Sequence, residues 1–214
     1  MCESLGRPMV QERPDRVNKR IEDIILSLLF LLAGGLVLFA LIALAIKLET
    51  PGPVLFRQTR RGKGTLHFRV LKFRTMTVTE HDAWAERQTV RNDPRVTRVG
   101  AFLRRHSLDE LPQFLNVLAG HMSIVGPRPH ALGTNIDGVP LEQLSECYLD
   151  RYKVNPGITG LAQVNGCRGN LDTVAKLNLR LSYDIDYIHQ QSIRFDHRIL
   201  IKTVLCLFKD KHAY

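Results

Sequence analysis

Cysteine and histidine are too few and too irregularly spaced to form a recognisable metal site. The chain has 214 residues, and its four cysteines, Cys2, Cys147, Cys167 and Cys206, include no CxxC pair. Its eight histidines form no HExxH arrangement. These absences exclude the common zinc-binding motifs, and we expect all four cysteines to be free thiols in a reducing compartment.

Glycine-rich nucleotide motifs and nucleic-acid modules are missing as well. There is no GxGxxG and no Walker-type lysine, so an ordinary nucleotide-binding loop is not indicated. Aromatic residues make up 7% of the chain and no known nucleic-acid module is recognisable, which argues against a nucleic-acid partner. The net charge of +9 suits anionic lipids, phosphorylated substrates or nucleic acid, so a membrane-tethered lipid- or nucleic-acid-binding adaptor stays open as an alternative.

Charge is absent from the 23 residues from Ile24 to Ile46, which is enough apolar chain to cross a bilayer. The run is too long for the apolar part of a signal peptide, although Ala43-Leu44-Ala45 resembles a cleavage site. Basic residues stand on both sides of it: Arg13, Arg16, Lys19 and Arg20 before it, and Lys47, Arg57, Arg60, Arg61 and Lys63 after it. Because positive charge marks the cytoplasmic side of a membrane, we expect a re-entrant helix that bends at Gly34-Gly35, and a plain spanning helix stays open.

These boundaries predict a polar tail over 1–20, a membrane-embedded helix over 21–48 and a cytoplasmic domain over 49–214. A hairpin is expected in the last part, with strands at Val54–Gln58 and Thr65–Thr75 and a bulge near Leu71. Helices are expected at Thr79–Gln88, Leu108–Leu118, Leu141–Tyr152, Asp172–His189 and Phe195–Lys209. The predicted fold class is therefore α+β, with a small hairpin sheet and amphipathic helices packed at the membrane surface. The final helix could belong to the core or to that surface.

Asp109 and Glu110 fall in the predicted first turn of a helix. Ser107 and Glu110 have the spacing of a capping box, and Pro112 is tolerated near a helix start. Leucine and phenylalanine side chains mark one face, whereas Asp109, Gln113 and Asn116 mark the other. The helix dipole alone can explain two acids there. Alternatively, the dipole and the preceding arginines keep Asp109 ionised beside bound phosphate, where it could act as a nucleophile.

Cations elsewhere are open to similar alternatives. Lys72 and Arg74 share one side of the second strand, as solvated charges or as a wall for phosphate. Arg128 stands between two prolines that restrict its backbone, which suits bidentate phosphate binding but also fits an ordinary turn. Asp184, in a predicted helix, could be a ligand or a helix-surface acid.

Five blocks in order resemble the monotopic phosphoglycosyl transferases, or bacterial sugar transferases, most closely the catalytic domains of undecaprenyl-phosphate glucose or galactose phosphotransferases. The resemblance covers about Lys19 to Tyr214. The blocks are Lys72-Phe73-Arg74-Thr75-Met76, Asp93-Pro94-Arg95-Val96-Thr97, Ser107-Leu108-Asp109-Glu110-Leu111-Pro112-Gln113, Met122-Ser123-Ile124-Val125-Gly126-Pro127-Arg128-Pro129-His130 and Pro156-Gly157-Ile158-Thr159-Gly160.

The resemblance implies transfer of a sugar 1-phosphate from a UDP-sugar, glucose or galactose, to undecaprenyl phosphate with release of UMP. This would be the first membrane step of exopolysaccharide, capsule or O-antigen synthesis, at the cytoplasmic face of the bacterial inner membrane. Asp109 would be the nucleophile that carries a covalent phosphosugar, and Glu110 would assist; both would hold Mg²⁺. Lys72, Arg74, Arg104, Arg128 and Asp184 would bind substrate or phosphate. Membrane lipid and a second copy of the chain are the further partners considered.

Two departures from the family pattern stand out. The middle of the apolar run reads Ala33-Gly34-Gly35, where the family usually has a proline, and this puts the re-entrant geometry in question. His121 stands where the family usually has an aspartate, so any supporting role of that acid is lost or moved. An inactive scaffold is a further alternative, against which stand the intact Asp109-Glu110 pair and Arg128.

Overall fold

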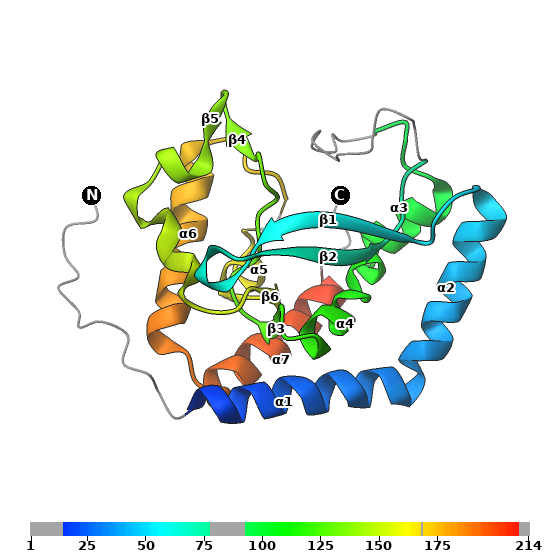
Figure 1. Ribbon diagram of the computed structural model, residues 1–214, viewed down its shortest axis with the longest axis horizontal. Coiled ribbons are helices and arrows are strands. Elements are labelled where there is room, and N and C mark those ends of the chain that lie inside the picture. Colours follow the sequence, from blue (N-terminus) through cyan, green and yellow to red (C-terminus); the bar gives the residue numbers. More distant parts are fainter. Residues whose placement is uncertain (1–14, 78–92, 168, 210–214) are drawn as a thin grey trace.

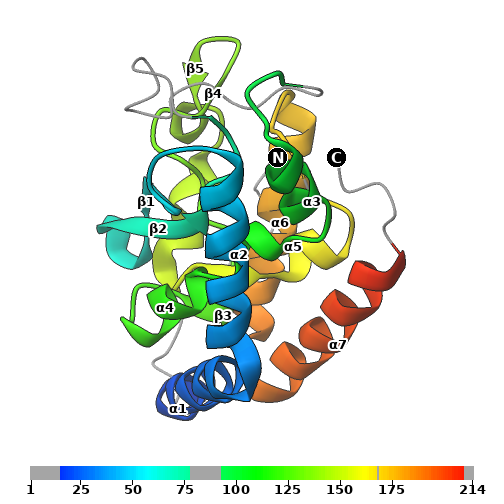
Figure 2. The ribbon, with the colours of Figure 1, turned by 90° about the vertical axis from the view of Figure 1, so that its right-hand side faces the viewer.

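The structure is a computed structural model that describes residues 15–77, 93–167 and 169–209 (Figure 1). The helix predicted at Thr79–Gln88 and most of the predicted tail lie outside the described residues. Within those ranges, helices surround three small two-stranded sheets, which confirms the α+β prediction. Figure 2 shows helices α1 and α7 near one end of the molecule and strands β4 and β5 at the other.

The apolar run forms two helices joined by a bend. Helix α1 (Asp15–Phe30) leads through a π-helical turn (Leu31–Gly35) into α2 (Leu36–Glu49). Gly34 has φ 120°, a conformation that glycine adopts without steric cost. The predicted bend at Gly34-Gly35 is therefore confirmed, and it needs no proline. In Figure 1, α2 leaves the direction of α1 and rises beside the β-hairpin.

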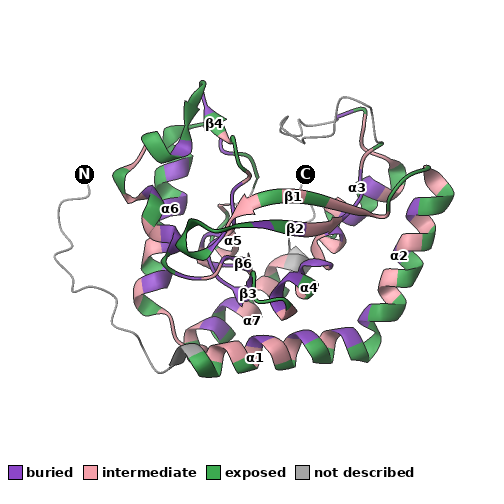
Figure 3. Ribbon diagram, viewed as in Figure 1, coloured by how far each residue is buried: buried purple, intermediate pink, exposed green. Residues whose placement is uncertain are grey.

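The outer surface of these two helices is apolar. Val17–Glu49 is the one stretch within the described residues that is long and apolar enough to cross a membrane. Figure 3 shows much of α1 and α2 in the colour of exposed residues. The exposed large side chains include Ile25, Leu29, Leu32, Leu36, Val37, Leu41, Leu44 and Leu48. Two polar side chains of α1 point inward: Ser27 is fully buried, and Asp23, just before the apolar run, accepts the Ile124 N–H at 2.9 Å. A re-entrant course through lipid stays a prediction.

Basic residues at the start of α1 bind the folded domain. Arg20 donates to the carbonyl oxygens of Val117 at 2.6 Å and Leu118 at 3.0 Å, which lie in the last turn of α4 (Gln113–Leu118). Lys19 donates to the Val125 carbonyl at 3.1 Å and pairs with buried Asp196. Lys19 and Arg20, which were assigned from sequence to the basic flank of the membrane segment, therefore bind α1 to the folded domain.

The predicted hairpin is confirmed. Strands β1 (Leu55–Arg61) and β2 (His67–Phe73) pair antiparallel around a 3₁₀ turn (Lys63–Thr65). The predicted bulge at Leu71 is wrong, because the register continues without a break from one end of the strands to the other. The hydrophobic pattern slips for another reason: Phe68 and Val70 join one buried cluster, and Phe73 joins a second cluster formed with α2.

The predicted helix over 108–118 is shorter than expected. Helix α3 (Arg98–Arg105) is followed by a 3₁₀ turn (Leu108–Glu110), and α4 (Gln113–Leu118) begins only after Pro112. The capping box is wrong: Ser107 has a left-handed backbone, φ 55°, and its side chain makes no capping hydrogen bond. The chain turns between α3 and the 3₁₀ segment, and Ser107 adopts its left-handed conformation in that turn. A helix N-cap needs an extended backbone at this position.

The polar face of α4 is buried rather than exposed. The Asn116 side chain accepts the Leu71 N–H at 2.8 Å and donates to the Arg69 carbonyl at 2.8 Å, as a neighbouring strand would. Gln113 is also buried, and Phe114 stacks on Phe30 with ring centroids 4.3 Å apart. Helix α4 thus joins the hairpin to the end of α1.

Replacing Asn116 by Ala is expected to lower the stability of the folded protein by about 2–4 kcal/mol, because a buried N–H and a buried C=O lose their partners. Thermal unfolding of the detergent-solubilised protein measures the loss. Asn116→Asp keeps an acceptor for the Leu71 N–H but loses the donor to the Arg69 carbonyl, so it should be destabilised less than Asn116→Ala. Equal stability of wild type and Asn116→Ala would contradict the bridging role.

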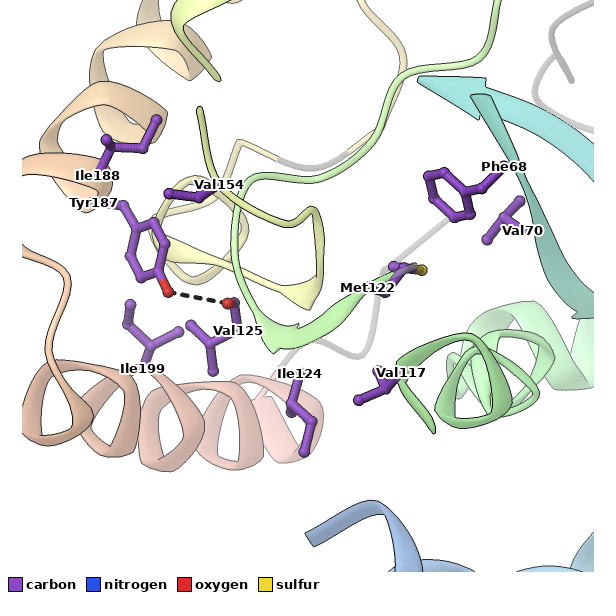
Figure 4. Close-up of a cluster of buried hydrophobic side chains, with 10 residues drawn as sticks. All are labelled: Phe68, Val70, Val117, Met122, Ile124, Val125, Val154, Tyr187, Ile188 and Ile199. Carbon is purple, nitrogen blue, oxygen red and sulfur yellow. Dashed lines mark hydrogen bonds between the residues drawn. The ribbon is translucent and has the colours of Figure 1, made fainter. Parts of the chain in front are cut away.

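A short parallel pair lies at the centre of the domain. Strand β3 (Ser123–Val125) pairs with β6 (Gly157–Thr159), and a Cβ added at Gly126 would lie 2.5 Å from the Asn155 carbonyl oxygen. Figure 4 shows the buried cluster around β3, where the Tyr187 hydroxyl donates to the Val125 carbonyl at 3.0 Å. Packing on both sides fixes β3 and the segment that follows it.

The C-terminal third follows the predictions with one exception. Helices α6 (Val174–Gln190) and α7 (Ile193–Lys209) are confirmed, and a short helix α5 (Leu161–Val164) precedes them. The predicted helix Leu141–Tyr152 is wrong: two 3₁₀ segments occupy it, Leu141–Gln143 and Glu146–Lys153. Buried Tyr148 and Arg151 are three residues apart, which matches the three-residue turn of a 3₁₀ helix. Strands β4 (Asn135–Ile136) and β5 (Val139–Pro140) form a small arm before it.

Two further details concern α7 and the cysteines. Helix α7 buries Ile199 but exposes Ile201, Val204 and Leu205, so it has both a core face and an outer apolar face. Cys167 and Cys206 are free, as predicted. Cys147 is disulfide-bonded, which corrects the prediction of four free thiols, since the absence of a CxxC pair does not exclude a disulfide.

Candidate active site

Four predicted site residues come together from three parts of the chain. Asp109 and Glu110 lie on the 3₁₀ turn between α3 and α4, Lys72 lies on β2, and Arg128 follows β3. The Lys72 ammonium is 2.6 Å from Glu110 Oε1 and 3.9 Å from Asp109 Oδ2. The reversal at Ser107 and the buried Pro112 set the direction of the two carboxylates.

Glu110 is tied to two cations. Both of its oxygens accept from the Arg128 guanidinium, Oε2 from Nη1 at 2.9 Å, and Lys72 also donates to Oε1. Burial opposes ionisation, but Arg128 and Lys72 outweigh it and hold the pKa of Glu110 well below its usual range. Burial also lowers the pKa of Lys72, against the attraction of Glu110. Glu110 is therefore an anchored carboxylate.

Asp109 has a different environment. It is only 8% exposed, and no hydrogen bond to its carboxylate is formed within the part of the chain that the structure describes. Burial raises its pKa, Lys72 opposes that shift and Glu110 adds to it. Asp109 thus keeps its lone pairs available toward a cavity, beside cations that favour its ionised form.

The cavity has a volume of about 1330 Å³ and lies along the hairpin and the β4–β5 arm. Eight arginine or lysine side chains line it, against three aspartates, so it suits a ligand with several negative charges. Four of these cations, Arg57, Arg60, Arg95 and Arg180, were not selected from sequence as phosphate ligands. Arg95 stands in one of the five family blocks, and Arg57 and Arg60 in the basic flank of the apolar run, but these patterns assigned none of them to phosphate.

Arg74 and Arg104 line the same cavity but are held differently. The two terminal nitrogens of Arg74 donate to the carbonyl oxygens of Thr50, at 2.8 Å, and of Pro51. Arg74 therefore binds the backbone just after the end of α2. Arg104 donates only from Nε, to Thr75 Oγ1 at 2.8 Å. Of the two, Arg104 keeps its terminal nitrogens available within the described chain, and the phosphate role of each stays a prediction.

Asp184 is neither a cavity residue nor a surface acid. It is 2% exposed and forms an ion pair with Arg151, Nη2 to Oδ2 at 2.8 Å. The surface alternative is therefore wrong, because α6 turns this side chain into the domain. Arg151 was missed in the sequence. It donates to the Arg128 carbonyl, pairs with His130 Nδ1 and lies over the rings of Tyr148 and Tyr152.

The backbone around Arg128 is thus held from two sides. His130 must accept from Arg151, since a guanidinium only donates, and burial with the Arg151 charge keeps the pKa of His130 well below its usual range. On the other side, Arg60 of β1 donates to the Pro129 carbonyl. Burial and the Arg128 charge lower the pKa of Arg60 to about 10, so it remains a cation at neutral pH.

The two carboxylates fit a magnesium ion in part. No group of three His, Cys, Asp or Glu side chains able to hold a metal occurs within the described ranges. Mg²⁺ usually takes one or two carboxylates and completes its shell with substrate phosphate and water. Asp109 has oxygens available for this, whereas the Glu110 oxygens already accept from cations. His121 is exposed, stacks on Phe68 and does not line the cavity.

Comparison with known proteins gives consistent results. The family model described as bacterial sugar transferase matches residues 14–210. A UDP-glucose:undecaprenyl-phosphate glucose-1-phosphate transferase of Escherichia coli K12 is 54% identical over 200 residues, which are 94% of this chain and 42% of that protein. The exopolysaccharide production protein PSS of Rhizobium leguminosarum bv. phaseoli is 50% identical, covering 89% of this chain and 95% of its own length. The chain therefore spans less than half of the Escherichia coli relative.

Proposed function

Because the chain belongs to the bacterial sugar transferase family, we propose that it transfers glucose 1-phosphate from UDP-glucose to undecaprenyl phosphate. The observation that carries this proposal is the Asp109 carboxylate, which faces a cationic cavity without a hydrogen-bond partner in the described chain. The name of the 54%-identical Escherichia coli relative, a glucose-1-phosphate transferase, supports glucose as the sugar. UDP-galactose, the other sugar donor considered from sequence, is tested alongside.

Asp109 would act as the nucleophile in two displacements at one phosphorus atom. Its carboxylate attacks the β-phosphorus of UDP-glucose, the bond from that phosphorus to the bridging oxygen breaks, and UMP leaves with the electron pair. The glucose phosphate is then held as an acyl phosphate on Asp109. An oxygen of the lipid phosphate attacks the same phosphorus, and the carboxylate is released.

Lys72 and Arg128 would supply the positive charge that these steps need. Both are already close to the carboxylates, so an incoming phosphate can share the positive charge that Glu110 now contacts. Glu110, which stays ionised, would hold these cations in place and support the approach of the lipid phosphate. Magnesium, when bound through Asp109 and Glu110, would supply further charge neutralisation to the pyrophosphate.

A lipid acceptor requires that this site lie at a membrane, and we propose the cytoplasmic face of the inner membrane. Both arms of the bent helix touch the domain: Asp23 of α1 binds β3, and Ile42 and Ile46 of α2 pack with Phe73 of the hairpin. A straight spanning helix would carry α2 away from these contacts, so they favour the re-entrant course. Residues 49–214 would then form the cytoplasmic domain. A homodimer stays a prediction.

The test is UMP release by the purified full chain in detergent with Mg²⁺, undecaprenyl phosphate and a panel of UDP-sugars. UDP-glucose should give UMP and a lipid-linked glucose diphosphate in equal amounts. Release with UDP-galactose instead would change the sugar and keep the mechanism. No release with any UDP-sugar, from protein that unfolds cooperatively, would reject the proposed function.

The rate should fall in acid at a higher pH than an ordinary aspartate would give. Only ionised Asp109 can attack, and burial raises its pKa, so activity is present above that raised pKa and is lost as pH falls through it. In Glu110→Gln a neighbouring negative charge is gone, so the acid limb of the residual activity should move to lower pH. Rates of UMP release across pH, without lipid, measure both limbs; a limb that moves upward in the variant would contradict this assignment.

A further inference from the structure

Arg180 is a cavity residue whose role is open. It lies on α6, lines the cavity and is 6% exposed. Its position is one helical turn before Asp184, the spacing at which an arginine and an aspartate on a helix commonly pair. Here they form no ion pair, because Arg151 occupies Asp184 at 2.8 Å.

The contacts of Arg180 leave its charge uncompensated. Nη2 donates to the Gly169 carbonyl at 3.1 Å, and Nε is buried without a partner. No carboxylate of the described residues lies within ion-pair distance of its guanidinium. A buried cation in this state is costly to the folded protein unless another anion neutralises it.

The surroundings add positive charge. Arg128 and Arg151 both oppose the Arg180 charge, and burial together with Arg128 lowers its pKa to about 10, so it is still protonated at neutral pH. Of these three arginines, Arg128 pairs with Glu110 and Arg151 with Asp184, whereas Arg180 has no ion pair among the described residues. Two of the three, Arg128 and Arg180, line the cavity.

We propose that Arg180, together with Arg128, binds a phosphate group of the substrate inside the cavity. A planar guanidinium with N–H donors available in a mostly buried site is suited to phosphate oxygens. The phosphate could belong to the donor pyrophosphate or to the lipid acceptor, and naming these two sources rests on the proposed function. The binding of a phosphate group at Arg180 does not rest on it.

Inorganic pyrophosphate, without Mg²⁺, is the first probe. It should raise the thermal stability of the full chain, and Arg180→Met should weaken this binding at least about tenfold, the loss of a charge-assisted contact. Arg180→Lys should be intermediate. Arg69→Met is the matched control, because it removes one charge from an exposed position of β2 that does not line the cavity and should change the affinity by no more than about twofold.

Stability without ligand separates binding from a structural role. If Arg180 is held for a phosphate, Arg180→Met should be at least as stable as wild type, because the uncompensated charge is gone. A loss of stability comparable to that of a broken ion pair would instead show a structural arginine. No pyrophosphate-dependent shift in wild type, or the same shift in wild type and Arg180→Met, would overturn the proposal.

Two further measurements identify the source of the phosphate. A raised Kd for UDP in Arg180→Met, with the KM for undecaprenyl phosphate unchanged, assigns the contact to the donor. The reverse pattern assigns it to the lipid. If wild type releases no UMP from any UDP-sugar but loses pyrophosphate binding in Arg180→Met, the proposed function fails while the phosphate site stands.

Discussion

Replacing Asp109 by Asn is expected to lower kcat for UMP release by at least ~10³-fold. The amide has nearly the same shape as the carboxylate but cannot displace UMP from phosphorus. Because no described residue hydrogen-bonds to Asp109, the substitution breaks no such bond within that part of the fold. The variant should therefore unfold at or above the temperature of the wild type, since a buried charge is removed.

Trapping distinguishes a nucleophile from a carboxylate that only binds metal. Wild type quenched after mixing with UDP-glucose labelled at the β-phosphate should carry label on the Asp109 peptide, and Asp109→Asn should carry none. Glu110→Gln is the matched control: it loosens Lys72 and Arg128, so turnover should fall, yet the adduct should still form. Asp109→Asn protein that released UMP within tenfold of the wild-type rate would reject the assignment.

The parts of the fold that were predicted from sequence are those with strong local patterns. The hairpin, α6 and α7 have clear alternation or helical periodicity along several turns, and each lies within a few residues of its predicted range. The bend at Gly34-Gly35 was predictable because it needs a positive φ at Gly34, and glycine adopts a positive φ without steric cost. Local preference and tertiary packing agree at these places.

The failures occur where distant contacts override local preference. Asn116 was placed only on the polar face of its helix, but it is buried and serves as the partner of a strand edge. Ser107 has the spacing of a helix cap, but the reversal after α3 places it in a left-handed conformation. The site shows the same division: Lys72 and Arg128 were selected by charge and proline neighbours, whereas Arg151 became visible only through its contacts with Asp184 and the Arg128 carbonyl.

Replacing Arg151 by Met is expected to have the second-largest effect on activity, although Arg151 does not line the cavity. The change leaves the Asp184 charge buried without its partner, which costs about 3–5 kcal/mol of stability. It also frees the Arg128 carbonyl and His130, so the arginine that holds Glu110 is no longer fixed. We expect kcat to fall about 10- to 100-fold, the range that displaced positioning groups produce.

A second change separates these two losses. In Arg151→Met/Asp184→Leu both buried charges are replaced by apolar side chains of similar size, which often restores the stability lost by the single variant. The hydrogen bond to the Arg128 carbonyl is still absent, so kcat should remain low. Thermal unfolding and UMP release, measured on the same preparations, give the two quantities.

A buried ion pair whose residues do not line the cavity provides the control. Asp196 of α7 pairs with Lys19 of α1 and is 3% exposed, so Asp196→Asn should cost stability in the same way but leave kcat in detergent within about threefold of wild type. The argument for positioning requires that activity follow the contact to Arg128 and not stability in general. If the double variant regained wild-type kcat along with its stability, Arg151 and Asp184 would serve only the stability of the fold. The position of Arg128 would then be fixed by its two neighbouring prolines alone.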